Sequence, residues 1–192
     1  MDIFAHGLWG AAAAKALNRS VGAFKRNPIS PWWTGFWATF PDLLAFTPLA
    51  VVIVLSLVTG DADFLGRGAT WFLYPFGHSA VTWTVVFLAA WAVFRRPRWE
   101  LLGWLTHIVI DIGTHPDGYY PTQFLWPLSD FTLGGISWRT ALFLGVNYAL
   151  LALVHYALRD HKNLKDGFRA MTLTRKVFFI LLFIVSFGAF IR

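Results

Sequence analysis

The chain has 192 residues, of which 57% are hydrophobic and 14% are charged, and its formal net charge is +6. Because a soluble domain needs more charge on its surface, this balance excludes an ordinary soluble fold and indicates that lipid covers much of the protein. Cysteine is absent, which excludes disulfides, thiolate catalysis and cysteine-ligated zinc. We therefore expect one integral-membrane domain over residues 1–192 with an all-α fold.

Six apolar segments are close in length to the roughly 20 residues that a helix needs to cross about 30 Å of hydrocarbon. They are residues 3–17, 37–58, 77–94, 99–113, 136–158 and 177–191. The first and the fourth are weaker, because they contain ionisable side chains. The pattern predicts a polytopic bundle of about six transmembrane segments, some of them only half-spanning. Residues 1–130 then hold the polar part, and residues 136–192 supply anchoring helices and a basic loop.

Basic residues gather in alternate loops. The loops after the first, third and fifth segments hold twelve of the sixteen Lys and Arg residues. The positive-inside rule places these odd-numbered loops in the cytoplasm, so both termini face the periplasm of a bacterial inner membrane. Juxtamembrane topology and anionic lipids account for the net charge, so we expect membrane lipids and no nucleic acid as partners. The sequence leaves the oligomeric state open.

Six ionisable residues lie in or beside the apolar segments, where such side chains are costly and mark candidate functional sites. They are His6, Asp42, His78, His107, Asp111 and His115. His107 and Asp111 are four residues apart, which places an imidazole and a carboxylate on one helix face. Gly113 and Pro116 end that helix, and His115 can fold back toward the same place.

The other candidates can converge with this pair. Gly7 and Gly10 let the first helix and its His6 approach neighbouring helices closely. Asp42 follows Pro41, where a kink is expected, and His78 begins the third segment. On the fifth segment, Asn147 is predicted to form a hydrogen bond between helices.

Four imidazoles and two carboxylates without a thiol suit a divalent metal, with Zn²⁺ the best fit and Mn²⁺ or Fe²⁺ as alternatives, and they can hold one or more ions. Such an ion lowers the pKa of water and polarises phosphoryl or carbonyl oxygens, which favours hydrolysis. Asp42 or Asp117 is the candidate catalytic base.

The segment from Thr106 to Asp111, followed by Thr114, Gly118 and Leu125-Trp126-Pro127, resembles the signature of the LexA-regulated, membrane-bound metal-dependent hydrolase family. His6, Pro41-Asp42 and Gly77-His78-Ser79 occur in the order of that family, so the resemblance covers about residues 1–130. It implies that the metal ligands are His6, Asp42, His78, His107 and Asp111.

The chain departs from the family pattern in two places. It has Pro41-Asp42-Leu43-Leu44-Ala45 where the family shows Pro-Asp-x-Asp-His, and Pro75-Phe76-Gly77-His78-Ser79 where the family shows His-Arg-Gly-x-Thr-His-Ser. A second Asp and two His are therefore missing. Either fewer metals bind, or His115 and Asp117 substitute. The ligand order is also similar to that of zinc-dependent phospholipase C and related nucleases, which implies phosphoester substrates.

Three functions remain open. The leading hypothesis is an integral-membrane metal-dependent hydrolase of a lipid-borne phosphoester or ester. The first alternative is a metal ion or proton transporter that uses the same His/Asp cluster, which requires access from both faces of the membrane. The second is a haem-binding membrane protein, with two of His6, His78 and His107 as axial ligands.

Overall fold

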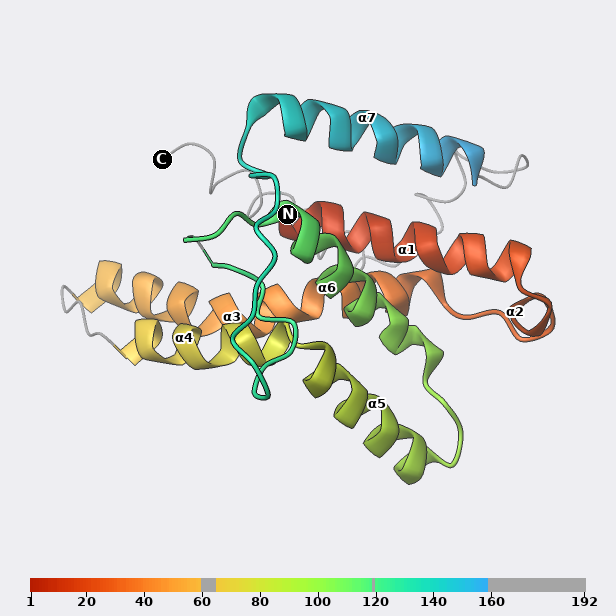
Figure 1. The fold of residues 1–192 in the computed structure, drawn as a ribbon, viewed down its shortest axis with the longest axis horizontal. Coiled ribbons are helices and arrows are strands. Elements are labelled where there is room, and N and C mark those ends of the chain that lie inside the picture. Colours follow the sequence, from red (N-terminus) through yellow and green to blue (C-terminus); the bar gives the residue numbers. More distant parts are fainter. Residues whose placement is uncertain (60–64, 119, 159–192) are drawn as a thin grey trace.

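A computed structural model describes residues 1–59, 65–118 and 120–158 of the chain. Within these residues the chain forms seven α-helices, one 3-10 helix and no strand, which confirms the predicted all-α fold. In chain order the elements are α1 (Ile3–Ser20), α2 (Gly22–Arg26), α3 (Pro31–Thr59), α4 (Leu65–Gly77), α5 (Ala80–Phe94), η1 (Trp99–Leu101), α6 (Leu102–Thr114) and α7 (Ala141–Ala157) (Figure 1). The segment predicted at 177–191 lies outside the described residues.

Helix α3 is the longest element and organises the others. It packs against α1, α4 and α6, and α6 also contacts α1 (Figure 1). Helix α7 lies along α1 at the edge of the bundle. Helix α1 begins at Asp2, whose side chain accepts a hydrogen bond from the Ala5 amide at 2.9 Å and so caps the first turn.

The chain bends sharply between α4 and α5. The axes of residues 70–77 and 80–94 differ by 70°. The Ser79 hydroxyl accepts hydrogen bonds from the amides of Val81 and Thr82, both at 3.1 Å, and this cap starts α5. His78 is therefore held in the break, between two helices that run in different directions.

Glycines bring α1 and α6 unusually close to α3. A Cβ atom on Gly103 would lie 1.9 Å from the carbonyl oxygen of Thr34, and one on Gly10 would lie 2.5 Å from Cβ of Ala38. The expected close approach of the first helix is confirmed, and α6 approaches α3 in the same way.

Replacing Gly103 tests how much the bundle depends on this approach. We expect Gly103→Ala to lower the free energy of unfolding by about 1–3 kcal/mol, because the new methyl group meets backbone rather than a side chain that can move. Thermal unfolding in detergent measures the effect. The matched control is Gly145→Ala on α7, where an added Cβ meets no described atom within 4 Å and should raise stability by about 0.5–1 kcal/mol. Equal effects of the two changes would contradict the packing argument.

In the part of the chain that the structure describes, one helix, α3, is long and apolar enough to cross a membrane by itself, and the bent pair of residues 70–77 and 80–94 makes a second if it is counted as one span. Helices α5 and α7 have 15 and 17 residues. At about 1.5 Å per residue such helices are shorter than the hydrocarbon layer. Six complete spans are therefore not confirmed among the described residues.

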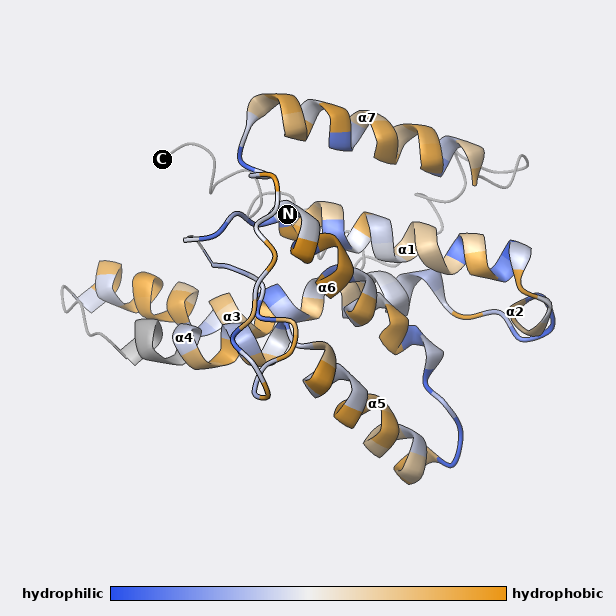
Figure 2. Ribbon diagram, viewed as in Figure 1, coloured by the Kyte–Doolittle hydropathy of each residue, from blue (hydrophilic) through white to orange (hydrophobic). Residues whose placement is uncertain are grey.

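The outer surface nevertheless has the character that a lipid environment requires. Figure 2 shows hydrophobic residues along α5, α7 and the second half of α3. Many of these side chains are exposed, including Val54, Leu57 and Val58 on α3, Val85 and Val93 on α5, and Leu142 and Leu153 on α7. Contiguous exposed apolar faces mark surfaces that another apolar phase covers, which indicates membrane association.

Candidate metal centre

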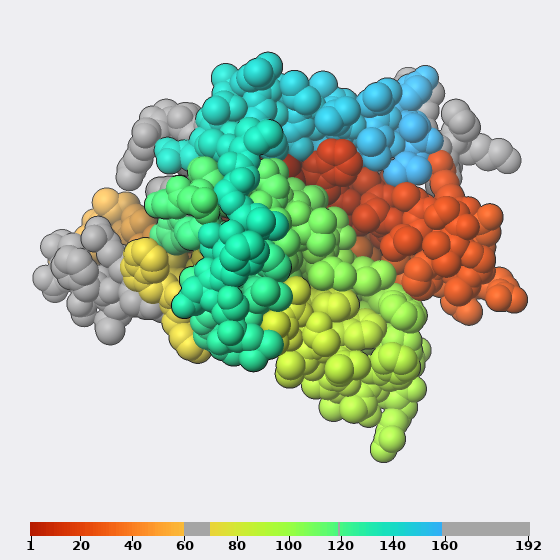
Figure 3. Space-filling view, in the orientation of Figure 1, coloured from red at the N-terminus to blue at the C-terminus, as the bar shows by residue number. Residues whose placement is uncertain are grey.

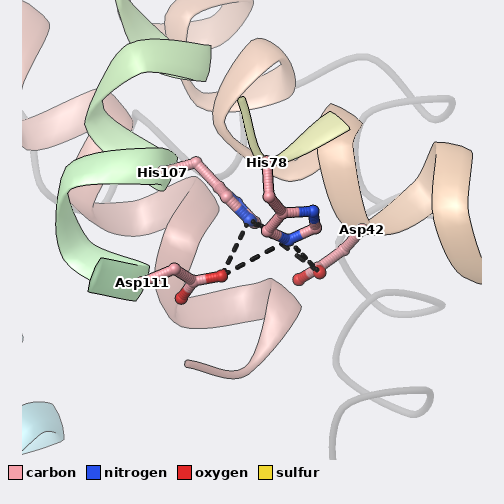
Figure 4. Close-up of side chains that lie close together, drawn as sticks. All are labelled: Asp42, His78, His107 and Asp111. Carbon is pink, nitrogen blue, oxygen red and sulfur yellow. Dashed lines mark hydrogen bonds and ion pairs between the residues drawn. The ribbon is translucent and has the colours of Figure 1, made fainter. Parts of the chain in front are cut away.

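Four of the predicted residues meet in the middle of the bundle and are called here the His/Asp group: Asp42, His78, His107 and Asp111 (Figure 4). Asp42 comes from α3, directly after the first of the two prolines inside that helix, His78 comes from the break between α4 and α5, and the other two come from α6. One ligand atom of each residue lies within 4.8 Å of the others, and all four residues are buried. The group could hold a metal ion.

The distances within the His/Asp group match those between the ligands of a small ion. Asp111 Oδ2 lies 3.1 Å from His107 Nε2 and 3.4 Å from His78 Nε2. Asp42 Oδ1 lies 3.4 Å from His78 Nε2 and 3.9 Å from His107 Nε2. Ligands that bind zinc tetrahedrally at about 2.0–2.2 Å are about 3.3–3.6 Å apart. The separations in the group, from 3.0 Å between the two Nε2 atoms to 3.9 Å, scatter around this range, so the group could hold one small ion.

The two imidazoles are held with lone pairs toward the centre. Nδ1 of His78 donates to the carbonyl oxygen of Tyr74 at 2.8 Å, and Nδ1 of His107 donates to that of Ala38 at 2.7 Å. A carbonyl only accepts, so each ring carries its hydrogen on Nδ1. The two Nε2 atoms are 3.0 Å apart, and at most one hydrogen fits between them. Histidines that bind metals typically donate their other nitrogen to a backbone carbonyl in this way.

Aromatic side chains fix the walls of the His/Asp group. The ring of Tyr74 stacks on His78 with centroids 3.9 Å apart, and its hydroxyl donates to the carbonyl oxygen of Tyr120 at 2.6 Å. The Trp104 indole donates to the carbonyl oxygen of Gly77 at 2.6 Å. Sequence reasoning missed Tyr74, although its position four residues before His78 on one helix face was an available signal.

His6 and His115 lie on the opposite side of Asp111. Asp111 Oδ1 is 2.9 Å from His6 Nε2 and 3.3 Å from His115 Nδ1, and the Met1 amino group lies 2.7 Å from the same oxygen. The His6 ring stacks on His107 with centroids 3.7 Å apart. His6 Nε2 is within hydrogen-bond distance of Asp111 Oδ1, and among the described residues Nδ1 of His6 has no hydrogen-bond partner. Asp111 thus faces the His/Asp group with one oxygen and two further imidazoles with the other.

Asp117 lies apart from the other predicted residues. It is exposed in the loop after α6, and its Oδ1 accepts a hydrogen bond from the Thr132 hydroxyl at 3.0 Å. His115, in the same loop, accepts a hydrogen bond on Nε2 from the Trp138 indole at 3.2 Å, which aims its Nδ1 toward Asp111. The structure therefore places Asp42 in the site and Asp117 at the surface, and the role of either as a base stays a prediction.

Comparison with protein families, curated proteins and solved structures gave no match for this chain. Its class is therefore defined by its own geometry. It is an α-helical protein with at least one helix long and apolar enough to cross a membrane, and with a buried His/Asp group able to hold a metal ion.

Proposed function

We propose that the protein is an integral-membrane, metal-dependent hydrolase of a lipid-borne phosphoester or ester. The observation that carries the proposal is the convergence of two Nε2 lone pairs and two carboxylates in a buried site, with both Nδ1 atoms committed to backbone carbonyls. A divalent ion there supplies Lewis-acid polarisation of a phosphoryl or carbonyl oxygen and lowers the pKa of water. The resemblance to membrane-bound metal-dependent hydrolases points to the same chemistry.

The ligand set favours Zn²⁺ over the alternatives. Two imidazoles and two carboxylates at tetrahedral spacing suit zinc, whereas Mn²⁺ prefers six oxygen-rich ligands. Haem is disfavoured, because two axial imidazoles must lie on opposite faces of the macrocycle, and 3.0 Å between the Nε2 atoms of His78 and His107 leaves no room for one.

A second ion explains why His6 and His115 face Asp111. Catalytic zinc sites have three protein ligands and keep one position open, whereas four protein ligands close the coordination shell. The His/Asp group offers four ligands. Asp111 Oδ1, His6 and His115 would offer three once an ion displaces the Met1 ammonium group from Asp111 and His115 gives up its hydrogen bond from Trp138, because that bond places the His115 hydrogen on Nδ1. We propose that Asp111 serves both ions and that the three-ligand side is where substrate binds.

The apolar outer surface supports a bilayer location. The proposed topology is multi-pass in the inner membrane, with the basic loops in the cytoplasm and the site open toward the periplasm. Helices shorter than the bilayer, such as α5 with 15 residues, then cross it only in part and are covered by their neighbours.

The direct test uses the full chain purified in detergent. We expect about two zinc ions per chain by elemental analysis and release of phosphate or of a headgroup from phosphatidic acid or phospholipid in mixed micelles. A chelator should abolish this activity and added Zn²⁺ should restore it. A protein without bound metal would overturn the proposal. Metal-dependent uptake into proteoliposomes without lipid turnover would show a transporter instead.

A further inference from the structure

An apolar groove lies beside the metal centre, between α1, α6 and α7. Its volume is about 340 Å³, and it is lined by Met1, Trp9, Ile110, Thr114, Phe143 and Asn147. In the space-filling view, atoms of α1 are seen between α7 and α6 (Figure 3). The one cationic group among the lining residues is the Met1 ammonium, which is already paired with Asp111 Oδ1, so the groove suits a hydrocarbon chain rather than an anionic headgroup.

One end of the groove adjoins the three-ligand side of the centre. The Thr114 hydroxyl lies 3.3 Å from Asp111 Oδ1, and the Met1 nitrogen lies 2.7 Å from the same oxygen. These two residues therefore separate the groove from the atoms to which His6 and His115 point. A chain lying in the groove would bring its polar end up to Met1 and Thr114, next to the metal centre.

The groove wall contains the buried side-chain amide of Asn147, which forms a hydrogen bond through its oxygen but not through its nitrogen. Asn147 is 6% exposed, and its Oδ1 accepts a hydrogen bond from the Trp9 indole at 2.9 Å. This confirms the predicted hydrogen bond between helices, and it fixes Nδ2 as the free donor. Among the described residues, none accepts a hydrogen bond from Asn147 Nδ2. A buried donor without a partner costs about 1–3 kcal/mol, which points to a ligand that supplies an acceptor.

We propose that the groove binds an ester-linked acyl chain of the lipid substrate, with Asn147 Nδ2 donating to the ester carbonyl oxygen. This inference rests on the proposed function and narrows its substrate to glycerolipids that carry acyl esters. Isoprenoid phosphates and ether lipids offer a hydrocarbon chain but no such carbonyl.

The test compares phosphatidic acid with ester-linked chains and its ether-linked analogue, in mixed micelles with the zinc-loaded full chain. We expect the wild type to prefer the ester by about 5–10-fold in kcat/KM, mainly through KM, because one hydrogen bond is worth about 1 kcal/mol. Asn147→Leu should reduce this ratio to about 1. Leu153→Ala, on the outer face of α7, should keep the wild-type ratio.

Two further measurements keep the inference open to refutation. Asn147→Asp retains an acceptor for the Trp9 indole but lacks the donor, so this variant should also lose the preference for the ester lipid. It replaces Asn147→Leu in the test if the leucine variant fails to fold. An ester preference that survives in a folded Asn147 variant overturns the inference, and so does a wild type without preference. If the wild type hydrolyses nothing, the proposed function fails. The affinities of the ester-linked and the ether-linked lipid, measured by native mass spectrometry, then test the groove separately: the same preference for the ester, about 5–10-fold, supports the inference, and equal affinities overturn it.

Discussion

Asp111→Ala is expected to release all bound transition metal and to lower lipid hydrolysis by about 10³-fold or more, since the charge stabilisation of the reaction is lost. The reason is its position: Oδ2 lies 3.1 Å from His107 Nε2 and Oδ1 lies 2.9 Å from His6 Nε2, so this one carboxylate belongs to both sides of the centre. Elemental analysis of the purified variant and its rate on phosphatidic acid measure the two effects.

Variants on either side of Asp111 separate the two proposed ions. His6→Ala combined with His115→Ala should leave about one zinc per chain, because the His/Asp group is intact, and should still abolish hydrolysis. The matched control is His155→Ala, a half-buried histidine on α7 whose Nε2 lies 3.0 Å from the carbonyl oxygen of Leu8. This control should keep both ions. Full metal content in Asp111→Ala would place the ions elsewhere and refute the assignment.

The local parts of the centre could be predicted from the sequence, because they depend on helix periodicity. The spacing of His107 and Asp111 alone fixes their common helix face. Asp42 stood out as a charge beside Pro41 in an apolar segment. Their convergence was anticipated from the sequence, but its geometry could not be predicted, because it depends on the 70° bend around His78 and on the close approach of Gly103 to Thr34. Both are tertiary features that no local pattern encodes.

Helix α4 (Leu65–Gly77) is a local element that the sequence did not predict. The segments predicted at 37–58 and 77–94 left residues 59–76 as a connection between them, and the glycines and Pro75 of α4 weaken isolated helices. Packing against α3 compensates for the low propensity and makes the segment helical. The number of complete spans stays a prediction for a related reason: hydropathy records how apolar a segment is, but not where the helix ends.

Removal of zinc is expected to lower the melting temperature of the wild-type protein by about 10 °C. Without an ion, the Nε2 atoms of His78 and His107 face each other at 3.0 Å beside two carboxylates. An ion that binds only the folded state stabilises it by about 4 kcal/mol when its free concentration is about 1,000 times Kd. For a domain of this size, each kcal/mol shifts the melting temperature by about 2–4 °C. Tryptophan fluorescence in detergent, with chelator and then with excess Zn²⁺, gives the two temperatures.

The Asp42→Asn variant tests whether a zinc-dependent rise in melting temperature comes from an ion bound at the His/Asp group or from side-chain packing. The amide has nearly the volume of the carboxylate, so packing is kept while the charge that favours the cation is lost. In the metal-free state the variant should not be more stable than the wild type, because the Met1 ammonium group pairs with Asp111 and His78 Nε2 lies 3.4 Å from Asp42 Oδ1. Excess zinc should raise the melting temperature of the wild type by much more than that of the variant, since only the wild type keeps all four ligands. If the wild type instead melted at one temperature with and without zinc, the four side chains would satisfy one another, and the group would be structural rather than a metal site.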